Sequence, residues 1–172
     1  GSRWGTGVVV GRTGLLFNNG TRIGSTSPYP DHRNYVRGGQ TPILNNSPTL
    51  VMKEGKFVFA VGTPGGEAIG QTQFQMLLNV FDFGLEIQEA IEAPRLALSA
   101  DPNFYRSGAE LTLRIENRIA SSVVSRLVEL GHTVELVPPY SLGNTQGILR
   151  NPETGALMAG ADPRRMMYAV GG

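Results

Sequence analysis

The sequence contains no cysteine and only two histidines, His32 and His132. The absence of cysteine excludes disulfides, thiolate metal sites and cysteine nucleophiles, and it leaves the redox compartment open. A catalytic triad or a multi-histidine metal site would have to use these two histidines, and neither lies in an HExxH or similar spacing. We therefore interpret His32 as a loop residue and His132 as a turn residue, and we predict no metal and no cofactor.

Excess charge and long hydrophobic runs are also missing. The 15 Lys and Arg residues nearly balance the 14 Asp and Glu residues, for a net charge of +1. This balance argues against a strong polyanion-binding surface, so we expect no nucleic-acid partner. No run approaches the roughly 20 apolar residues that span a bilayer, so we expect no membrane span in this chain. Hydrophobic residues make up 40% of the 172 residues, which is enough for a buried core.

Turn-forming residues are abundant, with 23 glycines and 11 prolines. The apolar runs 7–10 and 14–17 are separated by a glycine-bounded turn, which predicts a hairpin. Residues 20–47 form a long polar segment, and a loop of this length in a compact domain is usually functional.

The rest of the chain alternates strand and helix patterns. Hairpins are predicted where short apolar runs flank turn residues, and helices where apolar residues recur at helical spacing. The expected strands are 49–52, 57–61, 111–115, 133–137, 145–149 and 156–159; the expected helices are 67–80, 87–92 and 117–130; residues 100–110 are expected to be loop. We find no domain boundary and predict one mixed α/β domain over residues 1–172.

Several short motifs follow one another in a recognisable order from residue 4 to residue 165. They are Trp4-Gly5-Thr6-Gly7-Val8-Val9 with Gly14-Leu15-Leu16-Phe17-Asn18-Asn19, Ser47-Pro48-Thr49-Leu50-Val51, Val61-Gly62-Thr63-Pro64-Gly65-Gly66, Ala93-Pro94-Arg95, Gly131-His132-Thr133-Val134 and Ala161-Asp162-Pro163-Arg164-Arg165. Each motif alone is weak, but the ordered series resembles the small, C-terminal subunit of the γ-glutamyltranspeptidase family of N-terminal-nucleophile hydrolases.

This resemblance implies a fold and a mechanism. It implies a four-layer αββα sandwich, of which this chain would supply the C-terminal half. Family members are made as precursors that cleave themselves and free a threonine at the start of the small subunit. That threonine hydroxyl attacks an amide carbonyl with its own α-amino group as base, so histidine is not needed. The resemblance also implies a partner, the large N-terminal subunit from the same precursor, because half a sandwich exposes much apolar surface.

Gly65 and Gly66 are the candidate catalytic residues. They lie between a predicted strand and a predicted helix, where backbone N–H groups are unpaired and point outward. Glycine leaves room for a carbonyl oxygen to approach. The family resemblance assigns an oxyanion hole to this pair; the alternative interpretation is an ordinary turn.

The predicted substrate-binding residues depart from the pattern of the transpeptidases. A serine pair that holds the glutamyl carboxylate is replaced by Leu44 and Asn45, and leucine cannot donate a hydrogen bond. After Asn19, the family's Gln and Asp positions hold Gly20 and Ile23, and an apolar side chain cannot pair a desolvated ammonium. We therefore expect a less zwitterionic, more apolar acyl group, as in the cephalosporin-acylase-like branches of the family.

The nucleophile itself is expected outside this sequence or replaced, because the family's N-terminal strand would precede the first motif. This chain alone is then not competent for catalysis. The Gly1-Ser2 pair is also typical of a cloning remnant. We interpret Arg95, Asp162 and Arg164 as a structural arginine–carboxylate tie, and we expect residues 140–147 to lie near the active-site face.

The leading hypothesis is a γ-glutamyltranspeptidase-like amidohydrolase or acyltransferase that acts on a small-molecule amide or γ-glutamyl substrate through an N-terminal threonine acyl-enzyme, with a non-standard donor. One alternative is a true γ-glutamyltransferase acting on glutathione-like substrates, and another is an inactive homologue with a binding role. Many members of the family are periplasmic or extracellular, and the sequence leaves the location open.

Overall fold

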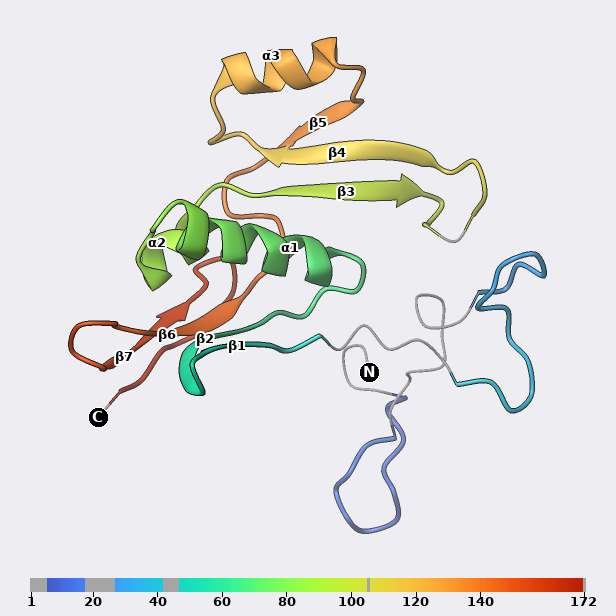
Figure 1. Ribbon diagram of the computed structural model, residues 1–172. Coiled ribbons are helices and arrows are strands. Elements are labelled where there is room, and N and C mark those ends of the chain that lie inside the picture. Colours follow the sequence, from blue (N-terminus) through green and yellow to red (C-terminus); the bar gives the residue numbers. More distant parts are fainter. Residues whose placement is uncertain (1–5, 18–26, 42–46, 105, 172) are drawn as a thin grey trace. The chain divides into compact units, whose positions relative to one another are not determined.

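The computed structural model describes residues 6–17, 27–41, 47–104 and 106–171 (Figure 1). The chain divides into two compact units. The N-terminal unit comprises residues 1–45 with 105–108, and the main unit comprises residues 46–104 with 109–172.

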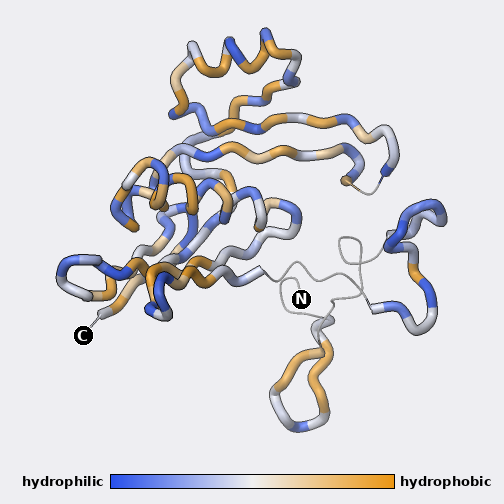
Figure 2. Tube along the Cα trace, viewed as in Figure 1, coloured by the Kyte–Doolittle hydropathy of each residue, from blue (hydrophilic) through white to orange (hydrophobic). Residues whose placement is uncertain are grey.

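In the N-terminal unit, the predicted hairpin is present. Val9 and Leu16 form an antiparallel bridge, and Phe17 donates its N–H to the carbonyl of Val8 at 3.0 Å. Gly11 and Gly14, at positive φ angles of 53° and 73°, allow the chain to reverse between the two arms. Figure 2 shows the arms as hydrophobic and the tip as polar. The pairing is a single bridge rather than the two regular strands that we predicted.

The main unit contains a four-stranded antiparallel sheet in the order β1-β2-β6-β7. Its strands are β1 (Thr49–Lys53), β2 (Lys56–Gly62), β6 (Gln146–Arg150) and β7 (Leu157–Ala161). Both predicted hairpins are confirmed. Glu54 and Gly55 turn the first hairpin with positive φ angles of 51° and 74°, as a tight two-residue turn requires.

Helices cover one face of this sheet (Figure 1). They are α1 (Ala68–Leu77), the π-helical turn η1 (Leu78–Asp82) and α2 (Ile87–Glu92). The buried core between the layers consists of Phe59, Val61, Met76, Val80, Ile87, Ala90 and Ile91. Gly147 and Gly160 bring α2 close to the sheet, because a Cβ there would lie 2.7 Å from Ile87 Cδ1 and 2.5 Å from Ile91 Cδ1, respectively.

The long helix predicted for 67–80 is present, but it is an α-helix only to Leu77 and continues as the π-helical turn η1. Phe83 donates its N–H to the carbonyl of Leu78 at 3.0 Å, which is the i→i+5 pattern of a π-helix. The widened turn contains Phe81, whose ring meets Phe59 edge-on with centroids 5.6 Å apart. The apolar face is also less complete than the sequence suggests, since Phe74 is 61% exposed.

A second, three-stranded sheet has the order β3-β4-β5. Its strands are β3 (Leu96–Asp101), β4 (Glu110–Glu116) and β5 (Val134–Val137), and α3 (Ser121–Glu129) connects the parallel pair β4 and β5. The strand β3 was not predicted from the sequence. The predicted helix 117–130 begins too early, because the N–H of Asn117 still donates to the carbonyl of Val137 in the sheet at 3.0 Å. Gly131, at φ 91°, follows the helix end as predicted.

Glutamine side chains cover two exposed sheet edges. Gln75 accepts from the N–H of Leu96 at 3.0 Å and donates to its carbonyl at 2.9 Å. Gln88 does the same for Ala161 of β7 at 3.1 and 3.0 Å. Each side-chain amide thus replaces a neighbouring strand for one residue.

The observed combination of sheets and helices confirms the mixed α/β class. No helix in the described ranges is long and apolar enough to cross a membrane. The assignment of the whole chain to one domain stays a prediction.

Candidate active site

The candidate site is the loop of residues 63–66, which we term the glycine loop, between the end of β2 at Gly62 and the start of α1 at Ala68. Gly65 and Gly66 have φ angles of 137° and 61°, which side chains other than glycine rarely adopt. Their carbonyls accept from the N–H groups of Ala68 and Ile69, both at 3.2 Å. Within the described part of the chain, neither glycine N–H donates a hydrogen bond.

Two amides that lie just before the N-cap of a helix and donate no hydrogen bond among the described residues suit an anionic oxygen. Gly65 is exposed and Gly66 is half-buried, so the amides lie at the surface of the main unit. This geometry fits the predicted oxyanion hole, whose role in this protein stays a prediction. Among the described residues, no group of three or more His, Cys, Asp or Glu could hold a metal ion.

Residues 140–145, which we term the arch, lie directly beside the glycine loop. The hydroxyl of Thr145 donates to the carbonyl of Gly62 at 3.0 Å. The hydroxyl of Thr63 reaches the carbonyl of Asn144 and that of Pro64, the latter at 2.9 Å, and donates its one proton to either. The arch therefore lies next to the candidate site, where the sequence predicted it.

A buried ion network lies behind the arch. Arg95 Nη1 contacts Asp162 Oδ2 at 2.7 Å. Arg164 contacts Glu116 through two parallel bonds of 2.8 Å and reaches Asp162 Oδ1 at 3.1 Å. All four side chains are at most 2% exposed. The predicted arginine–carboxylate tie between the C-terminal segment and the core is present, and it is part of a larger network.

The charged side chains in this network shift one another's pKa values. Burial alone would raise the pKa of Glu116, but hydrogen bonds from Arg164 and Arg118 overcome this effect and lower it to about 2. Burial, followed by the neighbouring charge of Arg164, lowers the pKa of Arg95. The pKa of Arg164 is raised, because its bonds to Glu116 and the charge of Asp162 outweigh the effect of burial. Glu116 is therefore ionised at neutral pH although it is fully buried.

Both carboxylates also hold the arch. Glu116 Oε1 accepts the N–H groups of Ser141 at 3.0 Å and Leu142 at 3.2 Å. Asp162 Oδ2 accepts the N–H of Thr145 at 2.8 Å. Neither Glu116 nor Thr145 was among the residues predicted from the sequence. The one available signal was the acidic residue Glu116 directly after the strand predicted for 111–115.

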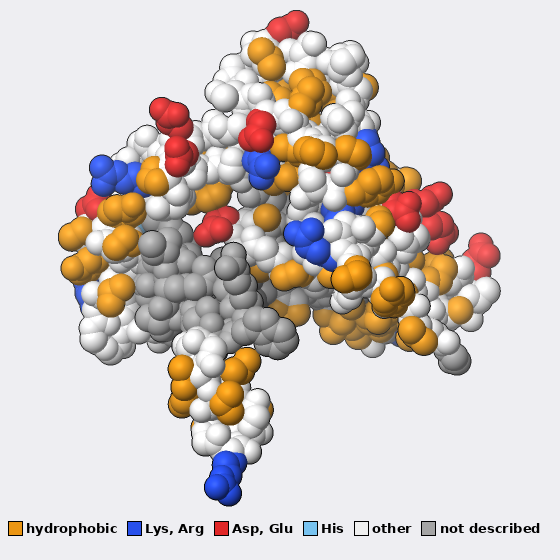
Figure 3. All heavy atoms as spheres, turned by 180° about the vertical axis from the view of Figure 1, so that it is seen from behind, with side chains coloured by type: hydrophobic (Ala, Val, Ile, Leu, Met, Phe, Trp, Pro, Cys, Tyr) orange, Lys and Arg blue, Asp and Glu red, His pale blue; other side chains and the backbone are white. Residues whose placement is uncertain are grey.

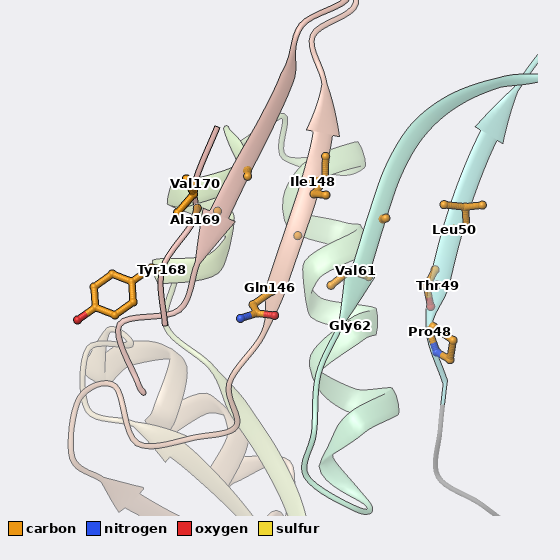
Figure 4. A pocket seen from close by; sticks show the side chains of 14 residues that line it. Pro48, Thr49, Leu50, Val61, Gly62, Gln146, Ile148, Tyr168, Ala169 and Val170 are labelled. Carbon is orange, nitrogen blue, oxygen red and sulfur yellow. The ribbon is translucent and has the colours of Figure 1, made fainter. Parts of the chain in front are cut away.

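The face of the four-stranded sheet opposite the helices carries an apolar cavity of ≈ 600 Å³ (Figure 4). Its lining residues come from all four strands and from the C-terminal segment: Pro48, Thr49, Leu50, Ala60, Val61, Gly62, Gln146, Gly147, Ile148, Ala159, Gly160, Tyr168, Ala169 and Val170. Leu50 and Leu157 on this sheet are each 64% exposed. Hydrophobic side chains also gather at the lower right of Figure 3, over the four-stranded sheet.

The predicted substrate-binding residues Asn19, Gly20, Ile23, Leu44 and Asn45 lie outside the described residues. Their roles stay predictions.

Comparison with known proteins gives matches over the whole chain. The family described as Gamma-glutamyltranspeptidase matches residues 1–172. The glutathione hydrolase proenzyme of Escherichia coli (strain K12) is 34% identical over 169 residues, covering 94% of this chain and 27% of that protein. The chain therefore spans about a quarter of that relative's length.

Solved structures are similar in fold as well. A gamma-glutamyltranspeptidase mutant from Helicobacter pylori superposes with a TM-score of 0.76 at 27% identity, covering 95% of this chain and 89% of that chain. A cephalosporin acylase from Bacillus halodurans gives a TM-score of 0.74 at 30% identity, covering 93% of this chain and 28% of that chain.

Proposed function

The chain belongs to the gamma-glutamyltranspeptidase family, and on that premise we propose that it is the small-subunit part of an amide hydrolase or acyltransferase that works through a threonine acyl-enzyme. The observation that carries the proposal is the pair of amides at Gly65 and Gly66, just before α1, which donate no hydrogen bond in the part of the chain that the structure describes. Acyl transfer through a tetrahedral intermediate needs such donors where negative charge develops.

The proposed reaction has two steps. A threonine hydroxyl from the N-terminal strand adds to the amide carbonyl, and its α-amino group takes the proton. The carbonyl oxygen becomes an oxyanion that accepts from Gly65 and Gly66, and it collapses as the C–N bond breaks and the amine leaves with the proton. Water, which gives a proton to the same amino group, then adds to the threonine ester. The C–O bond of the ester breaks, the threonine oxygen takes that proton back, and the acid is released. An amine acceptor in place of water gives acyl transfer.

The partner in this proposal is the large subunit of the same precursor. The chain spans only 27% of the length of the E. coli relative, whose name describes a proenzyme. The open face of the four-stranded sheet carries the apolar cavity and exposed Leu50 and Leu157. A second sheet from the large subunit would cover this face and complete the αββα sandwich.

The proposed donor is an acyl amide that is less zwitterionic than a γ-glutamyl group. This rests on Leu44, Gly20 and Ile23, which lack the polar groups that bind the glutamyl carboxylate and ammonium. The similarity to the B. halodurans cephalosporin acylase supports it. A glutathione-like donor is the second candidate, favoured by the 34% identity to the E. coli glutathione hydrolase proenzyme.

A direct comparison of two chromogenic anilides tests this proposal. The complete precursor is produced, allowed to process, and assayed with a γ-glutamyl anilide and with an anilide of an apolar acid. Faster hydrolysis of the apolar anilide, judged by kcat/KM, supports the non-standard donor. Faster hydrolysis of the γ-glutamyl anilide replaces it with the glutathione-like donor, and hydrolysis of neither contradicts the proposed reaction.

A further inference from the structure

Two threonine hydroxyls connect the arch to the end of β2 and to the first residue of the glycine loop. Thr145, on the arch, donates to the carbonyl of Gly62, the last residue of β2. Thr63, the first residue of the glycine loop, reaches back to the carbonyl of Asn144. The last backbone pair between β2 and β6 joins Gly62 to Gln146. The two hydroxyls therefore extend the pairing of these strands beyond its backbone end, up to the glycines of the candidate site.

Thr145 is buried, and both its backbone N–H and its hydroxyl form hydrogen bonds. Its side chain is buried, with the residue 0% exposed. Its N–H donates to Asp162 Oδ2 at 2.8 Å, and the same oxygen accepts from Arg95 at 2.7 Å. The arch also packs closely on α1 at Gly143, where a Cβ would lie 2.9 Å from the hydroxyl oxygen of Thr72. Thr145 is thus a fixed point that joins the buried ion network to the glycine loop.

We propose that Thr145, with Thr63 in support, is a positioning residue that sets the direction of the Gly65 and Gly66 amides for the oxyanion. The hydroxyl of Thr145 fixes the peptide at the end of β2, and the loop leaves β2 from that peptide. Through its bond to the N–H of Thr145, the side-chain carboxylate of Asp162 then influences the geometry of a site that it does not contact. This proposal rests on the oxyanion role proposed above.

Small changes in the direction of the Gly65 and Gly66 amides should change the reaction rate strongly. Oxyanion donors must lie 2.7–3.1 Å from the developing charge, and a misplacement of about 1 Å can cost about 100-fold in rate. Gly65 and Gly66 have no side chains, and their amides form no hydrogen bond within the described part of the chain. Their orientation therefore depends on the residues that fix the two ends of the loop, namely Thr63 with Thr145 at one end and α1 at the other.

The test compares Thr145→Val, Thr145→Ser and the control Thr112→Val in the complete, processed protein. Thr112 is a half-buried threonine on β4, so its replacement reports the general effect of exchanging a hydroxyl for a methyl group. We expect Thr145→Val to lower kcat about 10-fold to 100-fold with KM changed by less than about threefold. Thr145→Ser, which retains the hydroxyl, should restore most of kcat, and Thr112→Val should leave it unchanged.

A second readout is independent of activity. Hydrogen exchange at Ala68 and Ile69, whose amides donate to the carbonyls of Gly65 and Gly66, should become faster in Thr145→Val and stay as in the wild type in Thr145→Ser. Faster exchange in a protein whose wild type turns over no amide would support the positioning role and contradict the proposed reaction. An active wild type with unchanged kcat and unchanged exchange in Thr145→Val would overturn the positioning role alone, as would equal loss of kcat in the Val and Ser variants.

Discussion

The guanidinium of Arg164 forms two parallel hydrogen bonds to the carboxylate of Glu116, from Nε to Oε1 and from Nη2 to Oε2, each at 2.8 Å. Neither side chain is exposed to solvent. Arg164 further donates to the carbonyls of Ile91 at 2.8 Å and Ala93 at 2.9 Å. One side chain in the segment after β7 thus joins β4 to the end of α2.

Replacing Arg164 with lysine should destabilise the protein by about 3–5 kcal/mol, because a lysine has one ammonium in place of the planar fork and leaves buried Glu116 inadequately paired. The measurement is equilibrium urea denaturation. Arg126→Lys is the matched control, since the Arg126 side chain is 67% exposed in its pair with Glu129; its change should stay within about 0.5 kcal/mol. Equal effects of the two variants would contradict the importance of the buried pair.

The depressed pKa of Glu116 predicts a specific loss of stability in acid. In the folded protein the pKa is about 2, against an ordinary value of 4.5, so the unfolded chain binds more protons between these values. The stabilisation, about 3 kcal/mol for this shift, is fully present above pH 4.5 and is lost as the pH falls from 4.5 to 2.

Urea denaturation of the wild type and of Glu116→Gln at several pH values within that window measures this contribution. The difference in stability between the two proteins should shrink steadily as the pH falls. A difference that stays constant between pH 4.5 and pH 2 would show that Glu116 does not titrate as its surroundings imply.

A side chain at Gly160 on β7 should destabilise the protein. A Cβ would lie 2.5 Å from Ile91 Cδ1 and 3.1 Å from Ile87 Cγ1, so Gly160→Ala should displace these buried isoleucine side chains and cost about 1–3 kcal/mol. Gly70→Ala on α1, where no atom lies within 4 Å, should instead stabilise the helix by up to about 1 kcal/mol. In thermal melting, Gly160→Ala should lower the melting temperature and Gly70→Ala should raise it. A raised melting temperature in Gly160→Ala would contradict the packing of α2 on β7.

Gly66→Val should abolish turnover while leaving the fold largely intact. The φ angle of 61° strains any β-branched residue, so valine should turn the Gly66 N–H away from the oxyanion and crowd its approach. A misdirected donor acts as a lost one, and losing one oxyanion donor lowers kcat by about 100-fold to 1,000-fold. Gly84→Val is the control for backbone strain, because Gly84 has a similar φ of 68°, open space at its Cβ position and a place outside the candidate site. Near-normal kcat in Gly66→Val, with folding checked by circular dichroism, would show that the oxyanion assignment is wrong.

The sequence predicted those elements whose signals are local. Glu54-Gly55 predicted the first hairpin, and Pro94 placed the end of α2 correctly at Glu92. The strand β3 was missed because its residues, Leu-Ala-Leu-Ser-Ala-Asp, contain no β-branched or aromatic side chain. Its edge is stabilised by Gln71 and Gln75 of α1, which lie 27 and 21 residues away from their partners Leu98 and Leu96.

The candidate site likewise contains some residues that a local sequence pattern predicts and others that only the fold brings together. The glycine pair could be located from its place between a strand and a helix, since that signal is local. The network behind the arch could not be predicted in full, because Glu116 and Arg164 are 48 residues apart along the chain and only the fold brings them together. The role of Thr145 likewise depends on Gly62, 83 residues away.

The most direct test of the account is N-terminal sequencing and intact mass of every polypeptide in the purified, processed protein, before and after brief exposure to an acyl amide. The proposed reaction predicts a small subunit that begins with threonine, accompanied by a larger chain, and an added acyl mass on that threonine. A precursor that never processes, or a small subunit that begins with another residue and gains no acyl mass, would contradict it.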